Sequence, residues 1–261
     1  MNHQSQRPDV AATIERVLKP IQQFTRGWMM ADATTEYGER ELGLDRVSRQ
    51  FWLVGRAGVL GSCPAEVAAG ALAFHAPDKV AAAWNSLPAG VTHSEVAQHY
   101  AGRCIEWGER VLPMFEPQRL DAIDSLGRRI IDAAPDALGP LFAGWRALPI
   151  PGSVFGRVAL TTQVMREMRG AAHIAAVLSV GLSPLDAILA STNAPPRTGP
   201  EYAIRMGFEP PFRDPGEVMQ ARLEAESVTS RILEPFFSVL SPDEMATFGE
   251  VVETTRNAID M

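Results

Sequence analysis

The stretch THSEVAQHYAGRCIEWGERV, residues 92–111, decides the fold class of this 261-residue chain. It opens with Thr92-His93-Ser94-Glu95, a capping box in which the Thr hydroxyl and the Glu carboxylate each accept from a free backbone N–H at a helix start. After it, apolar residues recur at steps of four and three, which is typical of one side of an α-helix of about five turns. The apolar stripe consists of Val96, Tyr100, Cys104, Trp107 and Val111.

Four further helix starts carry a related signal, a Pro that follows a capping residue and precedes an acid. Pro suits the first helical position because its missing N–H would have no helical partner there, and the acid meets the positive end of the helix dipole. Strand patterns are nearly absent, so we predict an all-α protein of ten to twelve helices, with helix over well more than half of the residues. The four starts are Cys63-Pro64-Ala65-Glu66, Ser183-Pro184-Leu185-Asp186, Asp214-Pro215-Gly216-Glu217 and Ser241-Pro242-Asp243-Glu244.

The helices are expected in two closely packed halves. A Pro- and Gly-rich segment, 147–153, marks a boundary, so we divide the chain into an amino-terminal helical half, 1–148, and a carboxyl-terminal helical half, 149–261. Within the second half, an apolar stripe from Phe155 to Met168 predicts a helix that ends at Gly170, followed by a short helix that ends at Gly181.

Charge and composition narrow the classes of function. The net charge is −7, and residues 151–261 carry nine Arg and no Lys against fourteen acidic residues. Because nucleic-acid affinity rests largely on Lys and Arg at phosphates, this balance argues against a large DNA-binding surface. No signal-peptide pattern and no run of eighteen apolar residues occurs, so a cytoplasmic protein without membrane contact is expected.

Several short motifs occur in order along most of the chain. They are FWLVGRAGVLG at 51–61, PAEV at 64–67, FHAP at 74–77, VAAAW at 80–84, MREMRG at 165–170 and HIAA at 173–176. Together they resemble the SalK-like family of actinobacterial helix-turn-helix-like proteins, whose members occur near specialised-metabolite gene clusters. The resemblance implies a helical amino-terminal half and a carboxyl-terminal half related to winged helix-turn-helix folds. Between Ser191 and Asp214 no alternating strand pattern is present, so the winged fold would be degenerate, without a clear wing.

Arg56 is the first candidate for a binding site, because it lies in an otherwise apolar helical run, Phe51 to Leu60. A buried guanidinium is costly unless it meets a carboxylate, a carbonyl or an anion. Two interpretations stay open, an internal ion pair, for instance with Asp78 or a helix carboxyl end, and contact with the anionic group of a ligand.

His75, Arg166, Arg169 and His173 complete the list of candidate ligand-binding residues. His75 ends an apolar segment and is either a satisfied core residue or a hydrogen-bonding group in a pocket with Arg56. The other three are spaced by three and four, so they share a face if the helix continues through Gly170. That face is either solvated or a site for a carboxylate or phosphate.

No metal site is predicted. His93 and His99 lie six residues apart and face different sides of one helix. Glu95 and His99 could share a face, but two ligands do not make a zinc site. A haem iron on His75 or His173 is compatible with a helical protein, but no specific feature indicates it, so the cofactor stays unknown. Catalytic residues are likewise unknown, because no phosphate-binding loop, dinucleotide-binding turn or nucleophile elbow is present.

Two hypotheses for the function follow. The first is a small-molecule-binding protein, or an uncharacterised enzyme of bacterial specialised metabolism, that acts on an anionic, partly apolar ligand held between the halves. The alternative is a dimeric helix-turn-helix transcriptional regulator, in which a second copy of the chain is a partner. Its best reading helix would be Pro184 to Ala190, which carries Asp186 and no Arg or Lys. A nucleic-acid partner is therefore not expected.

Overall fold

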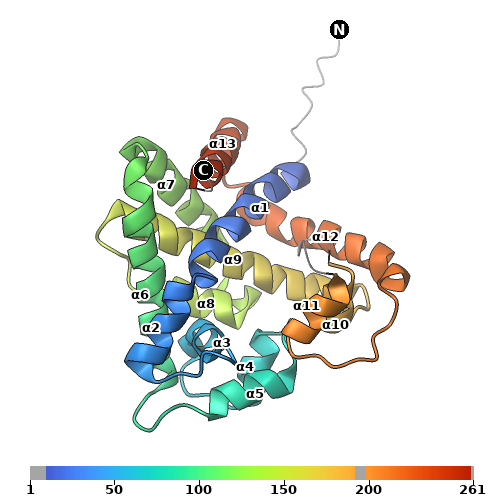
Figure 1. The fold of residues 1–261 in the computed structure, drawn as a ribbon. Helices are drawn as coiled ribbons and strands as arrows, with labels where there is room; N and C mark the ends of the chain where they lie inside the picture. Colours follow the sequence, from blue (N-terminus) through green and yellow to red (C-terminus); the bar gives the residue numbers. More distant parts are fainter. Residues whose placement is uncertain (1–9, 192–197, 260–261) are drawn as a thin grey trace.

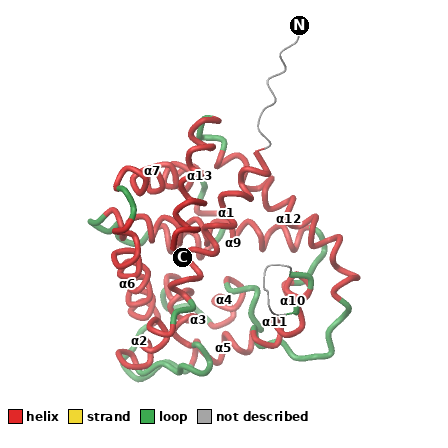
Figure 2. Tube along the Cα trace, turned by 45° about the horizontal axis from the view of Figure 1, so that its top comes forward, coloured by secondary structure: helices red, strands yellow, loops and turns green. Residues whose placement is uncertain are grey.

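The computed structural model describes residues 10–191 and 198–259, and these residues form an all-α fold that is 76% helix. The predicted fold class is confirmed, and no strand occurs in the described part of the chain (Figure 2). The α-helices of these residues are α1 (Val10–Met29), α2 (Asp32–Leu42), α3 (Gln50–Ala57), α4 (Ala65–Ala71), α5 (Pro77–Asn85), α6 (His93–Val111), α7 (Pro117–Ala133), α8 (Pro140–Arg146), α9 (Val154–Ser179), α10 (Pro184–Leu189), α11 (Gly199–Arg205), α12 (Pro215–Phe237) and α13 (Pro242–Ile259).

The described residues form thirteen α-helices, slightly more than the expected ten to twelve. Three single turns of 3₁₀-helix also occur in the described residues, at Gly58–Leu60, Leu112–Met114 and Asp136–Leu138.

The predicted helix starts are largely confirmed. Thr92 forms its capping box with Glu95, and Ser183 forms another with Asp186. Asp214 accepts from the backbone N–H of Gly216 at the start of α12. At Cys63-Pro64 the prediction is displaced by one residue, because α4 begins at Ala65 and Pro64 occupies the capping position.

α9 runs through the middle of the molecule and packs against α1, α6, α7, α8 and α12 (Figure 1). Fifteen of its 26 residues are buried, as expected of a helix that other helices surround. Its contact with α6 is close: a Cβ added at Gly108 would lie 2.7 Å from the Cβ of Ala159, so Gly is required there.

The predicted end of a helix at Gly170 is wrong. α9 continues from Val154 to Ser179 without a break. Gly costs about 1 kcal/mol relative to Ala within a helix, and the packing of the helix on both sides of this position outweighs that cost. The predicted helix end at Gly181 is closer to the structure, because α9 ends at Ser179 and the chain turns at Gly181, which has a φ of 76°.

The division at residues 148 and 149 stays a prediction. The segment between α8 and α9 is irregular, and Ser153 caps α9 by accepting from the N–H of Gly156. The largest hydrophobic core includes residues from both sides of this segment, from Ile14 to Val252. Two smaller clusters of buried residues lie around α10, α11 and α12.

Candidate functional site

A cavity of about 440 Å³, called the apolar cavity below, lies against one face of α9. The segments 67–75 and 138–141 form its other walls. Three of the residues that line it are polar, and the remainder are apolar or Gly. The cavity stays open because small residues line it: a Cβ added at Gly70 or at Gly170 would meet no atom within 4 Å. The polar residues are Arg56, His75 and Glu167.

Arg56 of α3 forms an ion pair with Glu167 of α9 in the wall of this cavity. Its Nε donates to Oε1 of Glu167 at 2.8 Å, and its Nη2 donates to Oε2 at 2.9 Å. Gln163 adds a third hydrogen bond, from its Nε2 to Oε1 at 2.8 Å. Burial acts to lower the pKa of Arg56, but the charge and hydrogen bonds of Glu167 outweigh it, and the pKa is raised. The two charges therefore neutralise each other inside the protein.

The internal ion pair was one of the two interpretations of Arg56, but the suggested partner, Asp78, is wrong. Asp78 lies in the first turn of α5 and is exposed. The partner is instead Glu167, which is 111 residues away from Arg56 and is not among the candidates from the sequence. One signal was present, because Glu167 follows Gln163 by four residues on a helix with few other polar side chains on that side.

His75 lines the same cavity as Arg56, whereas the sequence alone did not decide whether the two residues share a pocket. Its Nδ1 lies 3.0 Å from the carbonyl oxygen of Leu72. A carbonyl only accepts, so Nδ1 carries the hydrogen and Nε2 is left as an acceptor. This Nε2 is buried and finds no hydrogen-bond partner among the described residues. Burial, and then the charge of Arg56, lower the pKa of His75 to about 3, so the ring is neutral near pH 7.

Arg166 and Arg169 lie on a different side of α9 from Glu167 and line a different cavity. Nη1 of Arg166 donates to the carbonyl oxygen of Gln22 and to Oγ1 of Thr25, at 3.2 Å each. Nη2 of Arg169 donates to Oε2 of Glu226 at 2.7 Å. The five candidate residues therefore do not meet in one site, and these two Arg side chains face α1 and α12.

His173 is held between helices. Its Nδ1 lies 2.8 Å from Oγ1 of Thr229, whose hydroxyl donates to the carbonyl oxygen of Ala225, so Nδ1 is the donor. Its ring stacks on Phe74 with 5.5 Å between the ring centres. Burial, and then the charge of Arg169, lower the pKa of His173 to about 3. These contacts are those of a satisfied core residue.

A second cavity of about 650 Å³, called the cationic groove below, lies between α1, α9, α11 and α12. Its lining includes two acids, Glu15 and Glu226, and six cations. Only Arg166 and Arg169 are among the candidates from the sequence, because the other cations come from α1, α11 and the turn before α3. The six are Lys19, Arg26, Arg49, Arg166, Arg169 and Arg205.

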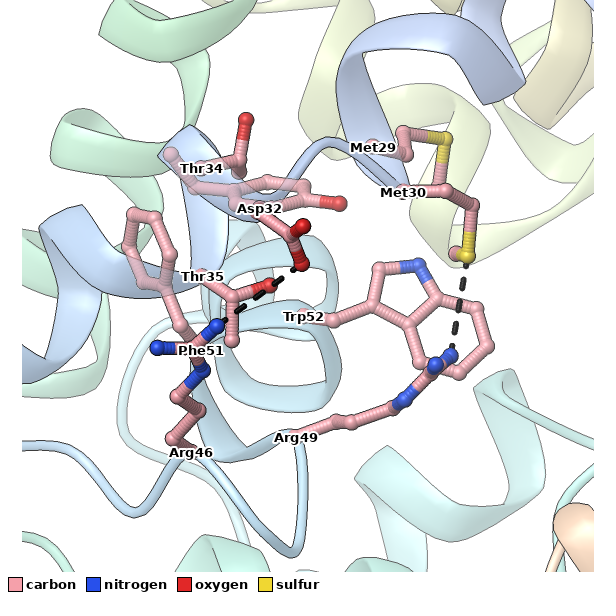
Figure 3. Close-up of a pocket in the computed structure, with 10 residues that line it drawn as sticks. Met29, Met30, Asp32, Thr34, Thr35, Arg46, Arg49, Phe51 and Trp52 are labelled. Atoms are coloured by element: carbon pink, nitrogen blue, oxygen red, sulfur yellow. Dashed lines mark hydrogen bonds and ion pairs between the residues drawn. The ribbon is translucent and has the colours of Figure 1, made fainter.

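A third, smaller cavity of about 150 Å³ adjoins the cationic groove, since Met30, Arg49 and Trp52 line both. Figure 3 shows the indole of Trp52 beside Met30, with the guanidinium of Arg49 next to them. Nη1 of Arg49 lies 3.6 Å from the sulfur of Met30. On the opposite side of this cavity, Arg46 pairs with Asp32 at 3.7 Å.

The described part of the chain shows neither a cluster of metal ligands nor a membrane-spanning helix. Residues 10–191 and 198–259 contain no group of three or more His, Cys, Asp or Glu side chains that could hold a metal ion. Within those ranges, none of the helices combines the length and the apolar character needed to cross a bilayer. His93 and His99 instead contact the carbonyl oxygen of Trp84 and the hydroxyl of Tyr37.

Comparison with known proteins identifies a family that this chain matches. The model of a helix-turn-helix family matches residues 11–211, which is well over half of the chain. No curated protein matches the chain. No solved structure matches it either. The family match agrees with the all-helical architecture, and its name points towards nucleic acid, against the expectation from the charge. The chain therefore belongs to this helix-turn-helix family.

Proposed function

We propose that the protein binds a small, largely apolar molecule in the apolar cavity, and that a hydroxyl or N–H of this molecule donates to Nε2 of His75. One observation carries the proposal: the mostly apolar lining of the cavity includes His75, whose buried Nε2 has no hydrogen-bond partner among the described residues. An apolar pocket with few convergent polar groups is the usual form of a small-molecule site. A ligand donor would supply the missing hydrogen bond.

The charges of the cavity favour a ligand without a strong charge. Arg56 is the one cation among the described residues that line it, and Glu167 already pairs with it. A second carboxylate would compete with Glu167 and would leave an unmatched charge in an apolar wall. The sequence predicted a ligand that is anionic and partly apolar. We propose that the ligand of this cavity is largely apolar and carries no strong negative charge.

Binding is a better proposal than catalysis by His75. A general base works best when its pKa is near the working pH. The pKa of His75 is about 3, so the ring is a weak base near pH 7, although it remains a good hydrogen-bond acceptor. A role in specialised metabolism, a cytoplasmic location and the SalK-like resemblance stay parts of this proposal.

Filling the cavity at Gly170 tests the proposal. Replacement of Gly170 by Leu should abolish binding of 2-naphthol, an apolar probe with one hydroxyl, because the new side chain points into the open space of the cavity. The free energy of unfolding should stay the same or rise by about 0.5–1 kcal/mol, since Gly within a helix is unfavourable. Binding is measured by calorimetry, and stability by urea unfolding.

The matched control is Gly102→Leu on α6. A Cβ at Gly102 also meets no atom within 4 Å, and this residue does not line the apolar cavity.

Wild type should prefer 2-naphthol over 2-methoxynaphthalene by about fivefold, the contribution of one hydrogen bond, and His75→Phe should lose this preference. Equal binding by wild type and Gly170→Leu, or no preference for the hydroxyl, would refute the proposal.

A second candidate function, a dimeric helix-turn-helix regulator, is favoured by the family match. The proposed reading helix, α10, buries Ala187, Ile188 and Leu189, and its Asp186 is used in a capping box. Recognition helices need exposed donors for bases and phosphates, which α10 does not provide.

We therefore expect no sub-micromolar, sequence-selective binding of duplex DNA at physiological salt. Fluorescence anisotropy with a pool of labelled duplexes, followed by the best binders one at a time, measures this directly. Tight selective binding, together with a dimer in size-exclusion chromatography with light scattering, would instead establish the regulator function.

A further inference from the structure

The cationic groove carries an inference that is independent of the apolar cavity. Its charge is unusual for a chain with a net charge of −7, since six cations and two acids line it. The two acids are Glu15 on α1 and Glu226 on α12. Glu226 pairs with Arg169 and also with Arg222, so it is already shared between two cations. The lining therefore contains more cations than acids.

Arg166 is a partly buried cation in the lining of the groove. Its Nη1 has neutral partners on α1, and none of the acids in the described residues forms an ion pair with it. Its Nε is buried and has no hydrogen-bond partner among those residues. Burial, and then the charge of Arg56, lower the pKa of Arg166 to about 10, and the opposite effect of Glu167 is smaller, so the charged form lacks full compensation. A bound anion would supply it.

Trp52 provides a second unsatisfied donor in the same lining. Its Nε1 is buried without a partner among the described residues. The indole also gives the groove an apolar wall, together with Met30 and Tyr202 (Figure 3 shows the first two). Two buried donors from different helices, an apolar wall and surrounding cations make a site with both an anionic and an apolar part.

We propose that the cationic groove binds an organic phosphate. The phosphate accepts from Nε of Arg166 and Nε1 of Trp52, and the apolar part of the molecule lies against Trp52, Met30 and Tyr202. A phosphate monoester suits the site better than a carboxylate, because it carries up to two charges and three acceptor oxygens, and Arg side chains bind it through several N–H groups. Lys19 and Arg26 at the exposed edge of the groove add attraction at longer range.

Calorimetric titration with phenyl phosphate at low ionic strength tests the assignment. Wild type should bind phenyl phosphate at least about tenfold more tightly than phenol or inorganic phosphate, because only phenyl phosphate uses both parts of the site. Arg166→Gln should weaken binding by about tenfold or more, the effect of a lost charge-assisted hydrogen bond. Arg26→Gln, at an exposed position, should weaken binding several-fold and reduce its salt dependence without affecting folding.

Two variants serve as controls. Arg110→Gln removes an exposed cation on α6, outside the groove, and should bind phenyl phosphate as wild type does. Gly170→Leu should also bind it normally, so failure of the apolar cavity and failure of the groove can be distinguished. The proposal is overturned if phenyl phosphate does not bind, if Arg166→Gln and Arg26→Gln bind it as tightly as wild type, or if inorganic phosphate binds equally well. Displacement of the probe by duplex DNA would overturn it in favour of a nucleic-acid site.

Discussion

Replacement of Arg56 by Met should lower the free energy of unfolding by about 3–5 kcal/mol, the usual cost of removing one partner of a buried ion pair. Met keeps much of the apolar length of Arg, so loss of packing is small. The damage comes from Glu167, which is 1% exposed and would keep only the hydrogen bond from Gln163. Urea unfolding of wild type and Arg56→Met at pH 7 measures the difference.

Two further variants separate the ion pair from other causes. The double variant Arg56→Met, Glu167→Met removes both charges and should recover much of the loss, because apolar side chains can replace a buried pair at little cost. Arg213→Met removes a 51% exposed cation that pairs with Glu217 and, at 3.6 Å, with Asp186, and should cost less than about 1 kcal/mol. If Arg56→Met were as stable as wild type, the pair would contribute nothing, and Arg56 would be better explained by a ligand.

Acidification should destabilise the protein before its carboxylates titrate. The pKa of His75 and that of His173 are each lowered from 6.5 to about 3 in the folded protein. Below pH 6.5 the unfolded chain binds protons at both rings and the folded protein does not. The contribution of the two rings to the free energy of unfolding is therefore fully present above this pH and is lost as the pH falls towards 3. Two such groups give a loss of about 4 kcal/mol between about pH 7.5 and about pH 5.

The measurement is urea unfolding at several pH values in that interval. The lowered pKa values of Glu226 and Glu244 give most of their loss of stability below pH 4.5, so they add only a small loss in this interval. Each of the variants His75→Gln and His173→Gln keeps one of the two buried rings. Each should therefore lose about half as much free energy of unfolding on acidification as the two rings cause in wild type, whatever the stability of the variant at about pH 7.5. An unchanged slope in both variants would show that neither ring is held neutral by burial.

Local chemistry accounts for what could be predicted about the fold. The helix starts at Thr92, Ser183 and Asp214 depend on side chains within three residues of the free N–H groups, so the sequence specifies them without reference to the rest of the chain. Gly170 shows the limit of such reasoning. Its low helix propensity is a local property, whereas the continuation of α9 depends on packing by helices that are distant in sequence.

The candidate site likewise has one feature that the sequence specifies and others that only tertiary packing decides. Arg56 could be recognised from the sequence as an exceptional residue, because a charge within an apolar helical run needs a partner wherever the helix lies. The identity of that partner depends on how α3 and α9 pack, and residues 56 and 167 share no local pattern. The two cavities are likewise products of packing, since the cations of the groove come from four separate segments. Periodicity and capping act over a few residues and determine helices, whereas ion pairs, unpaired donors and cavities exist only where distant surfaces meet.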